Sequence, residues 1–334
     1  MEKSILVTGA TGFIGGHLAR KLAERGEHVH ALCRRSANLA ELQHENITIH
    51  YGDILDRKSI ESAMEGCDRV FHLAAYARNW AKNPQTFIDI NVGGLRNVLE
   101  AAQQQRIRRV VFTSSELTIG PSNGIPANES TDRTSGAFTE YENSKLLAEE
   151  EAKRYVRNGL DVVIVNPTRV FGPGLLSEGN SVTRMIQLYM EGKWRAILGD
   201  GNLVGNYAYV QDVIAGQILA MERGRAGERY VLGGENVSFH ELFEAISDIS
   251  GRRYRMFHLP GSLALLFSRF ERQRARWTGG YPLITPGWVN VFLADWACST
   301  AKAETELGYS VTPLREALAN TIGWLEDEKE KMTK

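Results

Sequence analysis

The sequence predicts an α/β fold: a doubly wound parallel sheet, covered by helices on both faces, with a smaller, mostly helical C-terminal lobe. The main observation is a regular alternation of strand-like and helix-like segments in the first half of the chain. The strand-like, β-branched runs are residues 5–7, 29–32, 47–50, 70–73, 110–113 and 162–165. The helix-like segments are residues 12–25, 59–65, 84–104 and 138–157. Because consecutive parallel strands need helical crossovers, this order indicates repeated βαβ units.

The second observation is that this alternation ends near residue 173, where Gly and Trp become frequent and the elements less regular. We therefore predict a first domain of residues 1–175, rejoined by about 206–232. The remaining segments, 176–205 and 233–330, are predicted to form a lobe that covers the substrate.

Two strand-like runs after the break are expected to return to the main sheet. They are residues 207–210 and 229–232, with a helix between them. The stretch 199–206 that precedes them is predicted to be a loop with little secondary structure.

Composition points to small-molecule partners. The formal net charge of the 334 residues is -1, so no global field attracts nucleic acid or an anionic membrane. Cys33, Cys67 and Cys298 lie far apart without metal-ligand spacing, which favours a reducing cytoplasm and no metal site. The N-terminus leads directly into a strand, and the longest later apolar stretch, 263–267, is short, so neither a signal peptide nor a membrane span is expected.

A glycine-rich turn directly follows the first strand-like run. It reads Thr-Gly-Ala-Thr-Gly-Phe-Ile-Gly over residues 8–15, and the next residues continue as a helix. Gly9, Gly12 and Gly15 let the chain turn tightly and bring backbone N–H groups against a pyrophosphate. A glycine turn without a ligand is the alternative, but the position within a βαβ series favours a dinucleotide-binding Rossmann domain.

A tyrosine and a lysine stand four residues apart in the helix-like segment 138–157. Tyr141 and Lys145 therefore project from the same helix face. A free tyrosine titrates near ~10 and exchanges protons poorly at neutral pH unless a nearby positive charge stabilises the phenolate. Lys145 is the expected source of that charge, although such a pair also occurs as a simple exposed polar pair.

Together these motifs resemble the extended short-chain dehydrogenases/reductases, the NAD-dependent epimerase/dehydratase family. The glycines match the TGxxGxxG spacing of that family, and the tyrosine–lysine pair follows the strand-like run 110–113 at the expected interval. The resemblance covers nearly the whole chain. Within the family, the segments 34–35, 71–75 and 227–236 resemble the dihydroflavonol-4-reductase-like branch, which includes carbonyl reductases and hopanoid-associated sugar epimerases.

The resemblance implies binding of a nicotinamide dinucleotide. Arg34, or its neighbour Arg35, stands where NAD-preferring members have an acidic residue, so NADP(H) is expected rather than NAD(H). A solvated loop arginine is the alternative. Asp53 resembles the residue that binds the adenine amino group, although it could equally be a cap or turn residue. The implied cofactor-binding residues are Gly9, Thr11, Gly12, Phe13, Ile14, Gly15, Arg34, Asp53, Ile54, Leu73, Ala74, Ala75, Thr113, Tyr141, Lys145, Pro167 and Val170.

The resemblance also assigns catalytic roles to Ser115, Tyr141, Lys145 and Asn91. Ser115, with Ser114 as a close competitor, would bond the substrate oxygen and orient it toward Tyr141. Tyr141 would exchange a proton with that oxygen while hydride passes to or from the nicotinamide. Lys145 would also hold the nicotinamide ribose. Asn91 would support a proton relay, with a helix cap as the equal alternative.

The expected function is NADP(H)-dependent reduction of an aldehyde or ketone to an alcohol, or the reverse. A sugar epimerase or dehydratase is the alternative, but such enzymes generally carry a diphosphate-binding arginine before the run 207–210, and residues 203–208 contain no cation. A catalytically idle NADP-sensing regulator is a third hypothesis. His72 is expected to be structural rather than catalytic.

The lobe carries further candidates whose roles stay open. The basic run 269–276 could contact a membrane surface or an acidic substrate group, or be a solvated helix end. Family precedent implies a homodimer built from the helices at 84–104 and 138–157. Apolar residues that could line a substrate pocket, or belong to the core, are Trp194, Phe257, Leu263, Leu266, Phe267, Trp277, Trp288 and Phe292.

Overall fold

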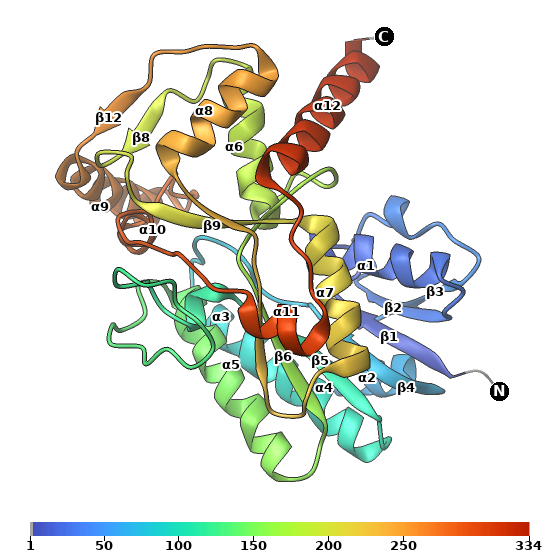
Figure 1. Ribbon diagram of the computed structural model, residues 1–334. Helices are drawn as coiled ribbons and strands as arrows, with labels where there is room; N and C mark the ends of the chain where they lie inside the picture. The colour runs from blue at the N-terminus through green and yellow to red at the C-terminus, as the bar shows by residue number, and fades with distance from the viewer. Residues whose placement is uncertain (1–2, 334) are drawn as a thin grey trace.

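A seven-stranded parallel sheet forms the centre of the computed structural model, which describes residues 3–333 (Figure 1). The strand order is β10-β6-β5-β4-β1-β2-β3, so the direction of winding reverses between β1 and β4. The strands are β1 (Ser4–Thr8), β2 (Val29–Cys33), β3 (Ile47–Tyr51), β4 (Cys67–His72), β5 (Arg109–Thr113), β6 (Val162–Pro167) and β10 (Arg229–Leu232). The predicted doubly wound fold is confirmed.

Helices cover both faces of this sheet, because the strands are apolar on both sides. One face packs against α1 (Phe13–Glu24), α7 (Val210–Arg223) and α11 (Ala301–Leu307). The other packs against α2 (Arg57–Met64), α4 (Gly94–Gln104) and α5 (Glu140–Arg157). Adjacent residues of β1 show the division: Leu6 belongs to the second core and Val7 to the first, and both are fully buried.

The predicted helix at 84–104 is interrupted by a wider turn. It consists of α3 (Gln85–Ile88), a π-helical turn (Asp89–Gly93) and α4. Asn91 lies within the π turn and is buried. Such turns are rare and occur frequently at functional sites, and periodicity alone gave no sign of this one.

One expected strand does not join the main sheet. Residues 207–210 were expected to rejoin it, but β9 (Val204–Tyr209) lies in a separate three-stranded sheet between β7 (Arg169–Phe171) and β11 (Glu235–Ser238). The prediction for β10 was correct, because β10 pairs with β6. The expected loop 199–206 is also shorter than predicted, since β9 begins at Val204.

The C-terminal lobe is mainly helical, as predicted. Its core lies among α6 (Ser181–Met190), α8 (Phe239–Ser250) and α12 (Leu314–Thr333). A two-stranded sheet of β8 (Ala196–Leu198) and β12 (Phe257–Leu259), together with α9 (Gly261–Thr278) and α10 (Pro286–Phe292), forms the side of the lobe drawn at the left of Figure 1.

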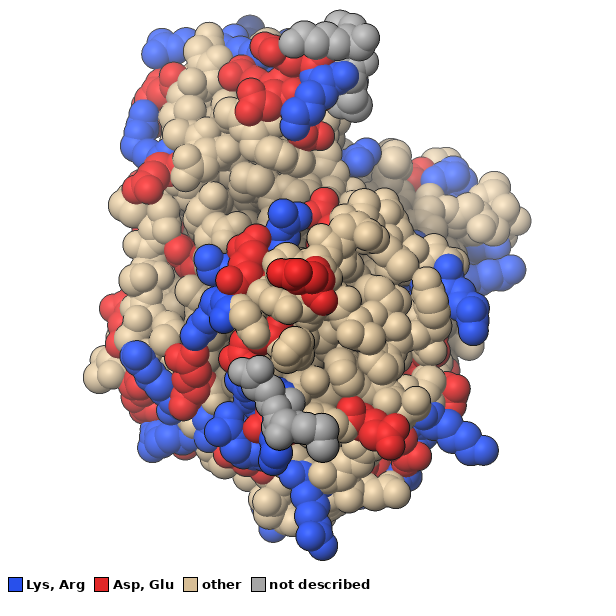
Figure 2. Space-filling view, turned by 90° about the vertical axis from the view of Figure 1, so that its right-hand side faces the viewer, with Lys and Arg blue, Asp and Glu red and all other residues tan. Residues whose placement is uncertain are grey.

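Charged side chains of both signs are interspersed on the face drawn in Figure 2, and neither sign dominates there. This distribution agrees with the net charge of -1 and gives that face no strong field for a polyanion. Among residues 3–333, no helix combines the length and apolarity needed to cross a bilayer.

Candidate active site

The predicted site residues gather at one edge of the main sheet. Strands β1, β4, β5 and β6 are neighbours and parallel, so their carboxyl ends meet at the same edge. This edge includes the reversal point between β1 and β4, where α/β sheets open a crevice for ligands. The predicted residues at this edge are Thr11 in the glycine turn, Phe13 and Ile14 at the start of α1, Leu73, Ala74 and Ala75 after β4, Thr113 at the end of β5, Pro167 at the end of β6, and Val170 in β7.

The glycine turn has no room for side chains. Gly9 has a φ of 74°, and a Cβ there would lie 2.6 Å from the backbone nitrogen of Ala74. A Cβ at Gly15 would lie 2.2 Å from the carbonyl oxygen of Gly9. Gly12 is the N-cap of α1, is exposed, and no side chain caps the helix. The first N–H groups of α1 are therefore open to an anion, as a pyrophosphate requires.

The two candidate arginines after β2 differ in their surroundings. Both are exposed. The Arg35 guanidinium lies 5.2 Å from the centre of the Tyr51 ring, a cation–π contact. Arg34 forms no ion pair with any residue between 3 and 333, so its guanidinium is available for an added anion. Asp53 uses one carboxylate oxygen to accept a bond from the Leu55 N–H (2.9 Å), and the actual cap of α2 is Asp56.

Tyr141 is positioned by the way α5 begins. Thr139 is the N-cap, and its side chain and that of Glu142 form a reciprocal capping box. Glu142 is fully buried and pairs with Arg133, which also donates to the Leu117 carbonyl (2.5 Å). These contacts fix the first turn of α5, and with it the direction of the Tyr141 side chain.

Burial raises the pKa of Tyr141 to about 12, and the nearby Ser115 side chain opposes that rise only partly. The Ser115 hydroxyl also accepts a bond from the Leu117 N–H (3.3 Å). Ser114 instead donates to the buried carboxylate of Glu149 (2.6 Å), so it is engaged elsewhere. Of the two candidate serines, the geometry favours Ser115.

Lys145 is buried and follows Tyr141 by about one turn of α5. Its Nζ donates to the Thr113 carbonyl (2.9 Å) and lies 5.1 Å from the centre of the Phe112 ring. Burial lowers the pKa of Lys145 to about 8, and the charge of Glu149 partly offsets this shift. The Lys145 charge is not among the causes of the Tyr141 pKa shift, in which burial is the largest, so the phenol is in its acid form at neutral pH.

Asn91 connects the π turn to α5. Its side-chain amide donates to the Ser144 hydroxyl (2.8 Å), and its oxygen accepts from the Tyr76 N–H (2.7 Å). Ser144 in turn donates to the Tyr141 carbonyl (2.7 Å). Asn91 therefore does more than cap a helix. Sequence reasoning missed Ser144, although its position three residues after Tyr141, on the same helix face, was a usable signal.

His72 is a buried structural residue. It is fully buried, its Nδ1 lies 2.8 Å from the Thr8 hydroxyl, and its Nε2 has no hydrogen-bond partner. Burial, together with the nearby Lys145 charge, lowers the pKa of His72 to about 3. The imidazole is therefore neutral at physiological pH.

This buried imidazole predicts a loss of stability in acid. The unfolded chain binds a proton near the ordinary pKa of 6.5, and the folded chain only near 3, so the free energy of unfolding should decrease as pH falls through this window. The slope from this group is on the order of 1 kcal/mol per pH unit. Urea unfolding at a series of pH values should show this slope in the wild type and in the exposed-site control His258→Gln. It should be reduced in His72→Gln, and an unchanged slope there would contradict the assignment.

A partly buried cation that was not predicted lies between the main sheet and the lobe. The Arg169 guanidinium is 3.9 Å from a Glu116 oxygen and 5.6–5.9 Å from the ring centres of Tyr207, Phe239 and Phe292. Burial raises the pKa of Glu116 to about 8, and Arg169 opposes this shift. The Glu116 carboxyl therefore offsets only part of the charge on Arg169 at neutral pH.

The apolar surroundings of Tyr141 come from both parts of the chain. Tyr141 packs with Phe138 and Trp288 around a cluster that includes the fully buried Trp296. The Trp288 indole N–H is buried without a hydrogen-bond partner among the described residues. An unpaired donor in an aromatic environment beside the phenol can hydrogen-bond a bound molecule.

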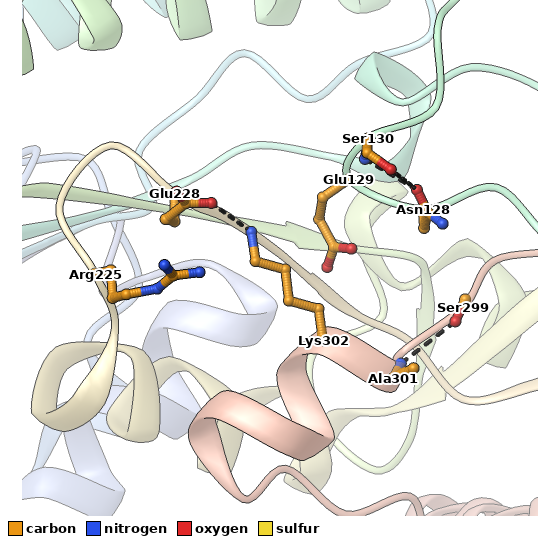
Figure 3. Close-up of a pocket in the computed structure, with 8 residues that line it drawn as sticks. All are labelled: Asn128, Glu129, Ser130, Arg225, Glu228, Ser299, Ala301 and Lys302. Atoms are coloured by element: carbon orange, nitrogen blue, oxygen red, sulfur yellow. Dashed lines mark hydrogen bonds and ion pairs between the residues drawn. The ribbon is translucent and has the colours of Figure 1, made fainter.

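A hollow of about 380 Å³ lies beside β10 (Figure 3). Its two cations are already paired: Lys302 with Glu228 (2.6 Å) and Arg225 with Glu306 (2.6 Å). It contains none of the predicted site residues. Among residues 3–333, no group of three or more His, Cys, Asp or Glu side chains could hold a metal ion.

Comparison with known proteins decides the family. A model described as the NAD dependent epimerase/dehydratase family matches residues 5–233. The chain belongs to this family. The family resemblance read from the glycine turn and the tyrosine–lysine pair is confirmed.

Family relatives span the full chain. A putative dihydroflavonol 4-reductase of Synechocystis sp. is 34% identical, over 98% of this chain and 96% of its own. Sterol demethylase protein B of Methylococcus capsulatus is 32% identical, over 96% of this chain and 98% of its own. The crystal structure of gox2253 is 33% identical with a TM-score of 0.84, and covers 98% of both chains. The UDP-glucose 4-epimerase of Thermotoga maritima has a TM-score of 0.81 at 24% identity over 98% of this chain and 99% of its own, which supports the fold alone.

Proposed function

We propose that this family member is an NADP(H)-dependent oxidoreductase that reduces an aldehyde or ketone to an alcohol, or catalyses the reverse reaction. The observation that carries the proposal is the Tyr141 phenol, which is protonated at neutral pH, lies near Ser115 and packs against an apolar cluster. Relatives named as cinnamoyl-CoA reductases are 28–33% identical to this chain, which supports carbonyl chemistry.

The residues at the glycine turn fit a dinucleotide. Gly9 and Gly15 leave the turn without side chains, and α1 begins without a side-chain cap. The uncapped N–H groups would hold the pyrophosphate, Arg34 a 2′-phosphate, and the backbone around Pro167 and Val170 the carboxamide. The nicotinamide, when bound, supplies or accepts the hydride.

The chain's own residues would handle the proton. Ser115 would bind the carbonyl oxygen and orient it, and Tyr141 would donate its proton to that oxygen as negative charge develops there. Lys145, when protonated, would stabilise the negative charge left on the Tyr141 oxygen after that proton is donated. Asn91, fixed through Ser144 and Tyr76, would hold the π turn in position for proton return from solvent.

Arg34 is the basis for preferring NADP(H), and its replacement tests that preference. In Arg34→Ser, loss of a charge-assisted bond should raise the KM for NADPH about 10- to 100-fold and leave the KM for NADH nearly unchanged. Arg35→Ser is the matched control, because Arg35 already contacts Tyr51, and it should have a smaller effect. Steady-state kinetics with both cofactors would measure this. Equal losses for NADPH and NADH in Arg34→Ser would contradict the role.

A sugar epimerase or dehydratase is the second candidate, and Arg169 is the observation that favours it. Residues 203–208 lack a cation, as the sequence indicates, but a Cβ at Gly205 would lie 2.6 Å from an Arg169 guanidinium nitrogen. A cation from β7 therefore fills the space beside this segment. It could pair with an anionic group of a substrate. An apolar carbonyl substrate agrees better with the aromatic cluster around Tyr141.

The test of the proposal is to follow NADPH oxidation with a panel of aldehydes and ketones, and separately to follow conversion of UDP-glucose. Turnover of a carbonyl compound with stoichiometric loss of NADPH supports the reductase. Conversion of the sugar nucleotide without net cofactor consumption would replace it with the epimerase. Tight NADPH binding with no turnover of either class would favour the sensing regulator.

The proposal also covers the cellular compartment and the oligomeric state of the protein. We place the protein in the reducing cytoplasm, and burial raises the pKa of Cys33 to about 11 and that of Cys67 to about 12, which keeps these thiols unreactive there. The proposed assembly is a homodimer through α3, α4 and α5, and sedimentation equilibrium would measure it.

A further inference from the structure

Helix α9 exposes a large apolar surface. The side chains of Leu266, Phe270 and Trp277 are 65%, 64% and 81% exposed, and Leu263 and Phe267 are also exposed. Four of them, Leu263, Leu266, Phe267 and Trp277, are among the residues that the sequence offers for the substrate pocket or the core. All five are exposed and so do not belong to the core. A contiguous exposed apolar surface of this kind marks an interaction site.

The exposed residues share one side of the helix. At 100° per residue, positions 263, 266, 267, 270 and 277 fall within an arc of about 100°. The face that packs against the rest of the lobe is a different one, made of small or paired side chains: Ala264, Ser268, Glu271 and Ala275 are buried. α9 is therefore held to the lobe by one face and presents an apolar face to the outside.

Arginines lie on the other exposed side of α9: Arg269 and Arg276 are next to one edge of the apolar face, and Arg272 is farther round the helix. Arg269, Arg272 and Arg276 are exposed and form no ion pair with any residue between 3 and 333. Arg274, by contrast, forms a two-pronged pair with Glu271 (2.8 Å for each bond), and Glu271 is the sole acidic residue of the helix. The free charge of α9 is therefore positive, although the protein as a whole has a net charge of -1.

We propose that α9 docks on the surface of a membrane that contains anionic lipids. An apolar stripe that includes Trp and Phe, with unpaired arginines on one side of it, is the pattern of a helix that lies in the interface plane of a bilayer. The arginines would lie at the level of the lipid phosphates while the apolar side chains enter the acyl boundary. A protein partner would have to supply several carboxylates around an apolar groove. The α9 helix of a second copy of this chain would not supply them, because its one acidic residue, Glu271, is already paired with Arg274.

The elements that adjoin α9 contact residues of the candidate active site. The segment after α9 brings Tyr281 to the Trp80 carbonyl (2.6 Å) and near the Tyr76 hydroxyl (3.5 Å). Tyr76 is bonded to Asn91. α10, which packs against α9, carries Trp288 into the cluster around Tyr141. A membrane-bound α9 would therefore hold the site close to molecules dissolved in the lipid.

Vesicle co-sedimentation with the full chain tests the proposal without any activity measurement. We expect binding to vesicles of phosphatidylcholine with phosphatidylglycerol and much weaker binding to phosphatidylcholine alone. Each substitution Arg269→Gln, Arg272→Gln or Arg276→Gln should lower the affinity for anionic vesicles about fivefold, and the triple variant on the order of 100-fold. High salt should weaken the wild type similarly.

Two further variants separate lipid insertion from charge attraction. Phe270→Glu should abolish vesicle binding, whereas Ile125→Glu, a control at a site that is 77% exposed on the loop between β5 and α5, should bind like the wild type. Because the replaced side chains are exposed, both should keep the wild-type thermal unfolding midpoint. The proposal is overturned if anionic vesicles leave the wild type in the supernatant. It is equally overturned if Phe270→Glu only converts a dimer to a monomer, which would make α9 an interface between copies of this chain.

Discussion

The Tyr141→Phe variant should lose about 10²- to 10⁴-fold in kcat for carbonyl reduction, the usual contribution of a positioned proton donor. The phenylalanine ring keeps the packing against Phe138 and Trp288, so the loss would be chemical rather than structural. Affinity for NADPH, measured by fluorescence titration, should stay within about twofold, since a bond made only in the transition state contributes to kcat rather than to binding.

Tyr155→Phe is the matched control for this prediction. Tyr155 lies on the same helix, and its hydroxyl bonds Glu100 (3.4 Å) away from the carboxyl edge of the sheet. Its removal should leave kcat unchanged. If Tyr141→Phe turns over carbonyl substrates as fast as the wild type, the proton must come from another group, and the proposed mechanism is wrong.

The pH dependence of the oxidation and reduction rates should follow from the surroundings of Tyr141. Burial raises the pKa of Tyr141 to about 12, so the phenol remains a proton donor throughout the neutral range. Oxidation of an alcohol needs the phenolate and should become faster as pH rises, whereas reduction should show no loss from deprotonation of Tyr141 below pH about 10. A reduction rate that falls as pH rises through neutrality would instead indicate a tyrosine that titrates there, and would contradict this prediction.

The main sheet could be predicted because its signals are local. Strand-like runs in β1, β2, β4, β5 and β6 are β-branched and bounded by helical patterns. Strand partners, however, are non-local. The run that became β9 looks like the others, and only the positions of β7 and β11 decide that it leaves the main sheet.

Part of the site could be predicted because it consists of short sequence motifs. The glycine spacing and the interval between Tyr141 and Lys145 can be read directly from the sequence. The pairing of Arg169 with Glu116 cannot, because these residues come from different elements and only the folded chain brings them together. The same holds for the exposed face of α9: its apolar residues have the composition of a core, and only packing shows that nothing covers them.

Gly9→Ala is predicted to cause the largest loss of cofactor binding together with a loss of stability. The new Cβ would lie 2.6 Å from the Ala74 nitrogen and 2.8 Å from the Leu73 carbonyl carbon, both backbone atoms, and the residue has a φ of 74°. Strain from the positive φ alone costs about 1–2 kcal/mol. The clash adds to it, because the turn must move away from β4. Thermal unfolding and NADPH titration should both show the change.

Substitutions at two other glycines distinguish a loss caused by backbone strain from a direct effect on cofactor binding. Gly26→Ala has the same strain, with a φ of 84° and no atom within 4 Å, so it should lower stability by a similar 1–2 kcal/mol and leave NADPH affinity intact. Gly12→Ala meets only the Gly9 oxygen at 3.2 Å. It should fold nearly as well as the wild type, but its methyl group would occupy space beside the open N–H groups of α1. Weak NADPH binding in a stable Gly12→Ala variant would locate the pyrophosphate at this helix terminus, whereas normal binding there would move the cofactor elsewhere.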